Sequence, residues 1–335
     1  MLEHGGKLRN AATRYQIPLD QWIDLSTGIN PNGWPIPAIP GECWVRLPEA
    51  DDGLVEAARC YYQSPHILPV AGSQAAIQAL PLLRPASVTG MLSPAYAEHA
   101  ANWQKAGHTL INLHPDTLNE VIGKLDVLVL INPNNPTGWR FSQTQLLAWH
   151  ENLQARGGWL IVDEAFIDTT PECSLANHIP RPGLIILRSL GKFFGLAGAR
   201  CGFVLADEAL LNQMNEQLGP WTLSHPCRYV AKKALCDRAW QERTSLALKQ
   251  QSQRLRLLLE SHGLIPDGHT DLFVWCKILQ AQALHERLAQ QGILTRLFET
   301  PSSVRFGLPK DERQWERLDI ALKTITPAIF GDKIG

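Results

Sequence analysis

Short apolar runs alternate with amphipathic stretches through the middle of the chain. The runs have the length of buried strands, and helical patterns separate most of them, the clearest over 142–157. Because apolar strands spaced by helices form βαβ units, this region predicts a buried, mainly parallel sheet. The expected strands are 87–92, 109–113, 126–131, 159–163, 184–188 and 201–206.

The N-terminal part of the chain has a different pattern. Its first 50 residues contain prolines at positions 31, 35, 37, 40 and 48, which exclude a long helix there. We expect this segment to wrap along a larger body or along a partner subunit. Two helices should follow, one from near Gly53 and one from Ser73, whose hydroxyl is expected to cap the second helix.

The pattern changes again after about residue 207. A long polar-rich helical stretch covers 238–263, and two short strands follow at 271–277 and 303–308 with a helix between them. This order predicts a smaller α+β domain after the α/β region. The chain is therefore expected to divide into three parts, which are an N-terminal arm, a large cofactor-binding domain and a small C-terminal domain: 1–50, 51–210 and 211–335.

Composition excludes several classes of function. The chain has 335 residues with 45% hydrophobic and 19% charged, and 31 Lys+Arg balance 32 Asp+Glu to a net charge of -1. This balance argues against nucleic-acid and anionic-membrane partners. No apolar run approaches the roughly 18 residues of a membrane helix, and the N-terminus has no signal-peptide core. Because the cysteines form no CxxC and the histidines show no ligand spacing, we expect a cytoplasmic protein without a metal site.

Four polar segments occur in order along the predicted sheet. They are NPNNPTG (132–138), VDEAF (162–166), SLGK (189–192) and Arg200, eight residues after the lysine. Ligands of open α/β sheets bind beyond the carboxyl ends of the strands. We therefore expect the four segments to meet in one pocket.

The residue types in these segments indicate one kind of chemistry. Lys192 follows a buried strand, where poor solvation favours the nucleophilic amine. Arg200 and Ser189 are suited to hold a phosphate group. Asp163 ends an apolar strand, so its carboxylate needs a cationic partner, and a pyridinium nitrogen is one. Together these groups predict a pyridoxal phosphate site.

The order and spacing of these residues resemble the fold-type I pyridoxal phosphate family, which has the aspartate aminotransferase-like α/β fold. Within it the chain is similar to the histidinol-phosphate aminotransferase branch, and most similar to the threonine-phosphate decarboxylases of cobalamin biosynthesis. The resemblance implies a mainly parallel central sheet flanked by helices, plus a smaller α+β domain. The closer match rests on HGGKLRNAA (4–12), DLSTGINP (24–31), RLPE (46–49), AGSQAAI (71–77) and VRFGLP (304–309).

The resemblance also implies roles for single residues. Lys192 should join covalently to pyridoxal 5′-phosphate, and Asp163 should pair with the pyridine nitrogen. Asn135 should hydrogen-bond the ring hydroxyl, and Tyr96 should stack on the ring. The cofactor phosphate is expected to bind Ser73, Gln74, Ser189 and Arg200.

A second set of residues is implied for the substrate. Arg305 matches the arginine that binds the substrate carboxylate, and Arg296 the one that meets the substrate phosphate. The full set expected to bind or close over the substrate is His4, Gly5, Gly6, Asn30, Asn135, Arg296 and Arg305.

Two positions depart from the pattern of the branch. Phe166 stands where aminotransferases of the branch usually have a tyrosine whose phenol donates to the ring hydroxyl, so the electronics of the ring should differ. Leu47 replaces a tyrosine that reaches the cofactor phosphate of the neighbouring subunit in relatives. That cross-subunit contact is therefore in doubt, although the homodimer implied by the family is not.

The resemblance implies decarboxylation of a small phosphorylated amino acid, O-phospho-L-threonine, to (R)-1-aminopropan-2-yl phosphate. The alternative is a histidinol-phosphate aminotransferase, which would break the Cα–H bond instead of the Cα–carboxylate bond. The residues alone do not separate these two reactions. A non-catalytic regulator of the same fold is a third interpretation, but the chain has no added DNA-binding segment and is not basic.

Overall fold

A computed structural model describes residues 4–330. The described chain forms two compact units, and each is considered by itself. The larger unit holds 33–135 and 140–243, and the smaller one holds the described residues up to Asn32, Pro136–Trp139 and those from Thr244 onward. The division into 1–50, 51–210 and 211–335 stays a prediction.

A seven-stranded sheet forms the centre of the larger unit, in the order β2-β8-β7-β6-β5-β3-β4. Neighbours from β7 to β4 are parallel, whereas β8 is antiparallel to both β7 and β2. The mainly parallel sheet predicted from the apolar runs is therefore confirmed. Its strands are β2 (Ile67–Val70), β3 (Val88–Leu92), β4 (Thr109–Leu113), β5 (Val127–Ile131), β6 (Trp159–Asp163), β7 (Leu184–Ser189) and β8 (Gly202–Leu205).

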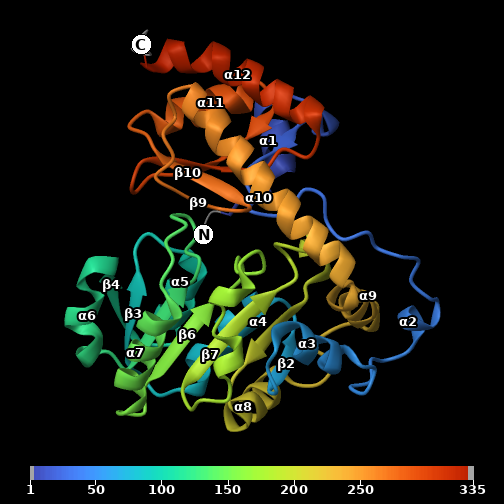
Figure 1. The fold of residues 1–335 in the computed structure, drawn as a ribbon, viewed down its shortest axis with the longest axis vertical. Helices are drawn as coiled ribbons and strands as arrows, with labels where there is room; N and C mark the ends of the chain where they lie inside the picture. The colour runs from blue at the N-terminus through green and yellow to red at the C-terminus, as the bar shows by residue number, and fades with distance from the viewer. Residues whose placement is uncertain (1–3, 331–335) are drawn as a thin grey trace. The chain divides into compact units, whose positions relative to one another are not determined.

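Helices cover this sheet, as Figure 1 shows, and this cover explains why most residues of its central strands are apolar. Every residue of β5 is buried, which is typical of a strand covered on both faces. The expected cap of α4 was wrong: Gly72 precedes the helix, Ser73 is its first residue, and no side chain caps it. The helices are α2 (Glu42–Val45), α3 (Leu54–Tyr62), α4 (Ser73–Ala79), α5 (Ala97–Lys105), α6 (Leu118–Val121), α7 (Gln143–Gln154), α8 (Glu208–Leu218) and α9 (His225–Cys236).

The smaller unit has the α+β character that the sequence predicts. A four-stranded antiparallel sheet has the order β12-β13-β10-β9, and β1 (Ile23–Asp24) pairs in parallel with β11 (Ile293–Leu294). The remaining elements are β9 (Gly268–Thr270), β10 (Phe273–Lys277), β12 (Arg296–Phe298), β13 (Ser303–Gly307), α1 (Leu8–Tyr15), α10 (Arg238–Ser261), α11 (Ala281–Gln290) and α12 (Glu312–Phe330).

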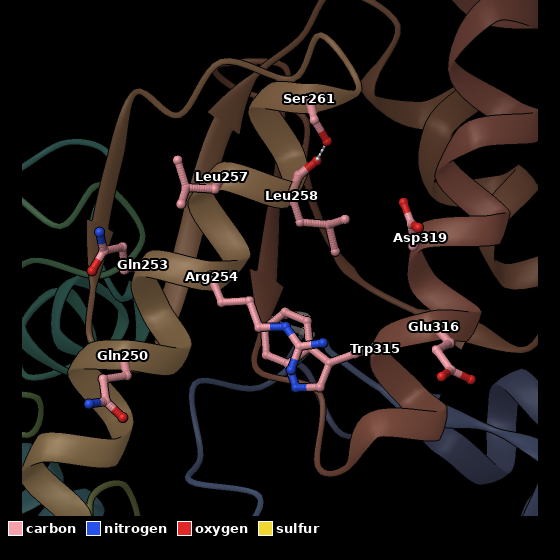
Figure 2. A pocket seen from close by; sticks show the side chains of 9 residues that line it. All are labelled: Gln250, Gln253, Arg254, Leu257, Leu258, Ser261, Trp315, Glu316 and Asp319. Atoms are coloured by element: carbon pink, nitrogen blue, oxygen red, sulfur yellow. Dashed lines mark hydrogen bonds between the residues drawn. The ribbon is translucent and has the colours of Figure 1, made fainter.

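A groove of about 580 Å³ lies between α10 and α12 in the smaller unit (Figure 2). The Arg254 guanidinium stacks over the Trp315 ring at 4.5 Å and makes two hydrogen bonds to the Glu312 carboxylate, of 2.6 and 2.7 Å. These contacts are exposed ones, so their contribution to stability is modest. They connect the two helices along one face of the unit.

A buried ion network supports β6 and β7 in the larger unit. Arg188 contacts Glu164 at 3.0 Å and Asp168 at 2.7 Å, with all three side chains at most 3% exposed. Ser174 donates to Glu164 at 2.5 Å, and Tyr61 donates to Asp168 at 2.9 Å. Burial raises the pKa of Glu164 even against the opposing effect of Arg188. Burial lowers the pKa of Arg188, but the two carboxylates outweigh it and raise that pKa overall.

We expect Arg188→Met to destabilise the protein by about 3–5 kcal/mol, because it leaves two buried carboxylates without their cation. Arg181→Met is the matched control, since Arg181 is 41% exposed and lies 4.0 Å from Glu151. Loss of such an exposed pair costs less than about 1 kcal/mol. Urea unfolding of both variants measures the difference, and equal free energies of unfolding for the two would contradict this role of Arg188.

Candidate active site

The sheet of the larger unit brings the polar segments of the sequence to one edge. β6 ends at Asp163, whose neighbours in register are Ile131 of β5 and Leu187 of β7. The Asn132 nitrogen, just after β5, donates to the Asp163 carbonyl oxygen at 2.9 Å. On the other side, Gly202 at the start of β8 pairs with Ser189 at the end of β7 and with Val70 at the end of β2. The turn after β2, which holds Ser73, therefore lies at this same edge.

Two glycines allow the groups expected to bind phosphate to approach each other closely. A Cβ atom at Gly72 would lie 2.8 Å from Arg200 Nη2, and one at Gly202 would lie 2.6 Å from the Ser73 nitrogen. Gly72 also has φ +72°, which a side chain would strain. Ser189 is half-buried, and its hydroxyl accepts from the Gly191 nitrogen at 3.1 Å. A side chain at either glycine would therefore clash with Arg200 or with the Ser73 backbone, so glycine permits this close approach.

The Asp163 carboxylate is buried and is held by a histidine that sequence reasoning missed. Its side chain is 5% exposed, and Oδ2 lies 3.0 Å from His99 Nε2, itself 3% exposed. The Ala165 nitrogen donates to Oδ1 at 3.1 Å. His99 stands three residues after Tyr96 at the start of α5, so helical spacing from the expected stacking residue was the one signal that could have identified it.

Tyr96 lies in the same cluster as Asp163. Its hydroxyl is 3.4 Å from Gln74 Oε1, and its ring meets the His99 ring edge-on with centroids 6.3 Å apart. Gln74 in turn donates to Glu98 at 2.8 Å. Burial, together with the Glu98 and Asp163 carboxylates, raises the pKa of Tyr96 to about 12, so its hydroxyl stays protonated at neutral pH.

Lys192 occupies a closed loop after β7. The Gly195 nitrogen donates to the Lys192 carbonyl oxygen, and the Leu196 nitrogen to that of Leu190, both at 3.1 Å. The half-buried Lys192 ammonium stands 5.5 Å from the centroid of the buried Phe166 ring. Phe166 therefore offers Lys192 an aromatic face where a tyrosine would also offer a hydroxyl. Asn135 is half-buried in the turn that follows β5.

The smaller unit brings two expected substrate residues face to face. Arg296 of β12 and Arg305 of β13 are direct cross-strand partners. Arg305 is only 6% exposed, and its guanidinium lies 5.0 Å from the Phe273 ring centroid. Burial lowers the pKa of Arg305, Arg296 lowers it further, and Asp24 opposes them. Because like charges opposite each other destabilise a sheet, this arrangement favours an anion between the two arginines.

Of the other expected substrate residues, His4, Gly5, Gly6 and Asn30 lie in the smaller unit, whereas Asn135 lies in the larger one. Asn30 is buried, and its Oδ1 accepts from the Asn32 nitrogen at 2.9 Å. The Gly6 nitrogen donates to the Ser26 hydroxyl at 2.7 Å, and Gly5 packs against the Ser26 carbonyl. His4 is half-buried. Sequence reasoning missed Ser26, although it stands inside the DLSTGINP segment that carries part of the resemblance.

Residues 4–330 also bear on metal binding and on membrane-spanning helices. In this range, no group of three or more His, Cys, Asp and Glu side chains is arranged to hold a metal ion. None of the described helices combines the length and apolarity that crossing a membrane requires.

Comparison with known proteins gives the family. The model of aminotransferase class I and II matches residues 54–321. A threonine-phosphate decarboxylase of Pseudomonas aeruginosa is 56% identical over 96% of this chain and 97% of its own length. One of a Sinorhizobium species is 39% identical over 95% and 97%.

A solved structure confirms the fold. The histidinol-phosphate aminotransferase of Sinorhizobium meliloti, in complex with pyridoxal-5′-phosphate, superposes with a TM-score of 0.83 at 20% identity, covering 98% of this chain and 99% of that one. At this identity the likeness shows the aspartate aminotransferase-like fold alone. The family match and the full-length relatives confirm the resemblance that the four polar segments predicted. The chain belongs to the aminotransferase class I and II family, and within it groups with the threonine-phosphate decarboxylases.

Proposed function

We propose that this chain uses pyridoxal 5′-phosphate to decarboxylate O-phospho-L-threonine, giving (R)-1-aminopropan-2-yl phosphate and carbon dioxide. The observation that carries this proposal is the full-length similarity to decarboxylases at 56% and 39% identity. By contrast, the histidinol-phosphate aminotransferase structure is 20% identical and bears on the fold only. The product would serve cobalamin biosynthesis, in line with the resemblance.

The residues of the larger unit fit the cofactor. Ser73, Ser189 and Arg200 offer hydroxyl and guanidinium donors at one edge of the sheet, which suits a phosphate group. Asp163 is a buried carboxylate whose charge calls for a cation, and a protonated pyridine nitrogen supplies one. When bound, the cofactor supplies an electron sink for the bond that breaks.

Each side chain then has a defined task. Lys192 would hold the cofactor aldehyde through its amine and would be the group placed to return a proton to Cα. Asp163 keeps the ring nitrogen protonated, while His99 fixes the carboxylate in place at 3.0 Å. Tyr96 would cover the ring face, and Asn135 would donate to the ring hydroxyl. Protonation of Tyr96 at neutral pH keeps this face free of negative charge.

The smaller unit fits a substrate with two anionic groups. O-phospho-L-threonine carries a carboxylate and a phosphate, and we assign the first to Arg305 and the second to Arg296. The cross-strand pairing of these arginines supports the assignment, because it holds two guanidinium groups side by side, one for each anionic group of the substrate. Binding of both anionic groups fixes the orientation of Cα.

We also propose that the chain acts as a cytoplasmic homodimer. Large apolar side chains are exposed along the segment before α3 in the larger unit: Ile36 is 60% exposed, Trp44 67%, Val45 83% and Leu47 62%. Such a run is typical of a surface that another protein covers. A second copy of the chain is the partner that the family implies, and Leu47 would then give an apolar contact in place of the tyrosine of relatives.

Product identification tests the reaction directly. Cofactor-loaded protein should release carbon dioxide from O-phospho-L-threonine without any keto acid, because decarboxylation needs no amino acceptor. The product is identified by mass spectrometry with and without 2-oxoglutarate. Turnover of histidinol phosphate that depends on 2-oxoglutarate, with no carbon dioxide released, would identify an aminotransferase instead. No turnover of either substrate with the cofactor bound would indicate a regulator.

Phe166→Tyr should lower the pKa at which the cofactor-bound Lys192 nitrogen titrates, by about one unit for one added hydrogen bond. The reason is that the new phenol would donate to the ring hydroxyl, as the tyrosine of related aminotransferases is expected to do. Absorbance titration of the holoenzyme measures this pKa. Phe298→Tyr, at a half-buried position of the smaller unit, is the control. If both variants titrate like the wild type, Phe166 does not lie against the ring.

A further inference from the structure

Ser26 stands at the centre of a hydrogen-bond network in the smaller unit, and its side chain has no role in the chemistry described so far. The residue is 2% exposed. Its hydroxyl donates to Asp24 Oδ1 at 2.6 Å and accepts from the Gly6 nitrogen at 2.7 Å. Its carbonyl oxygen accepts from Arg305 Nη2 at 2.8 Å. One residue thus connects the N-terminal glycines, an acidic side chain and the buried arginine.

The backbone around Ser26 is tightly enclosed. A Cβ atom at Gly5 would lie 2.3 Å from the Ser26 carbonyl oxygen, so only glycine allows the N-terminal segment to pass so close. On the other side, the Gly307 nitrogen donates to the Leu25 carbonyl oxygen at 2.7 Å. A Cβ at Gly307 would lie 2.3 Å from the Thr27 carbonyl oxygen. The segment from 24 to 27 is therefore held between the N-terminal glycines and β13.

The Ser26 carbonyl fixes one edge of the Arg305 guanidinium. Because the guanidinium is planar and its N–H groups have a fixed geometry, a bond at one edge sets the direction of the others. The ring of Phe273 lies at 5.0 Å from the guanidinium and limits it on a second side. The direction of the Arg305 donors thus depends on where the Ser26 carbonyl points.

The Ser26 hydroxyl controls the direction of that carbonyl. Both the Ser26 nitrogen and its hydroxyl donate to the same oxygen of Asp24, at 2.9 and 2.6 Å, which closes a tight local turn. The hydroxyl also holds the Gly6 nitrogen. Without the hydroxyl the turn would keep one of its two bonds to Asp24 and would lose its bond to the N-terminal segment.

We propose that Ser26 is a positioning residue for the anionic substrate, orienting Arg305 through its carbonyl and holding the segment around Gly6 through its hydroxyl. The proposal rests on the substrate assignment made above for Arg305. It predicts that Ser26 acts on binding of the substrate carboxylate, and that the bond-breaking step, which belongs to the residues of the larger unit, is left nearly unchanged.

The test compares Ser26→Ala with Ser26→Thr in the full-length holoenzyme. Ser26→Ala should raise KM for O-phospho-L-threonine about tenfold, the loss that corresponds to about 1.4 kcal/mol for one charge-assisted bond, while kcat stays within about twofold. Ser26→Thr keeps the hydroxyl and should restore KM to within about threefold of the wild type. The dissociation constant of O-phospho-L-threonine, measured by calorimetry in a Lys192→Ala background that does not turn it over, should change in parallel with KM.

Ser252→Ala is the matched control. Ser252 is a buried serine of the same unit, and its hydroxyl donates to the Thr270 carbonyl oxygen at 2.9 Å. This variant should lose thermal stability without a change in KM. An equal rise in KM for both alanine variants would overturn the proposal, because it would show a general effect of lost packing. A fall in kcat without a change in KM in Ser26→Ala would overturn it as well.

Asp24→Ala tests whether Asp24 and Ser26 act together as one network or through separate contacts. If Asp24 and Ser26 act as one unit, the double variant should bind O-phospho-L-threonine no more weakly than either single variant. If the losses of binding affinity add up in the double variant, Asp24 acts independently of the Ser26 hydroxyl, which would contradict the proposal.

Calorimetric binding also separates this inference from the proposed function. Wild-type protein that binds O-phospho-L-threonine without releasing carbon dioxide would refute the decarboxylation. The Ser26 variants would still test the anion site in that case.

Discussion

The chemistry of this protein depends on a negative charge that is held out of water at the end of a strand. Asp163 is 4% exposed, and the described contacts that fix it are His99 and the Ala165 nitrogen. A buried carboxylate is stable as an anion only where a cation or several donors compensate it. This constraint creates a place for a cationic ring, which would accept the electron pair of the bond that breaks.

The two units carry key charged side chains of opposite sign. The larger unit holds the buried Asp163 carboxylate, whereas the smaller unit holds the cross-strand pair of Arg296 and Arg305. Glycines allow close approach in both units. Gly72 leaves room for the Arg200 guanidinium, and Gly5 leaves room for the Ser26 carbonyl. Glycines in these segments therefore allow the backbone to lie close to charged or polar groups, in addition to forming turns.

The sequence predicted those features that depend on local patterns. Apolar runs identified six of the seven strands of the large sheet, and the spacing from Asn135 to Arg200 indicated the cofactor. It missed β2, whose four residues include Pro69 and carry little periodicity. It also missed His99, whose contact with Asp163 spans 64 positions, and Ser26, whose bond to Arg305 spans 279. Contacts of this kind depend on the tertiary fold, and the one local signal was the helical spacing of His99 from Tyr96.

The most direct measurement is borohydride reduction of the cofactor-loaded protein followed by peptide mapping. The account predicts a single pyridoxyl label, on Lys192, since this lysine is the amine that the loop after β7 presents at the edge of the sheet. A label on another lysine, or no label at all with the cofactor bound, would contradict the assignment of this edge as the catalytic centre.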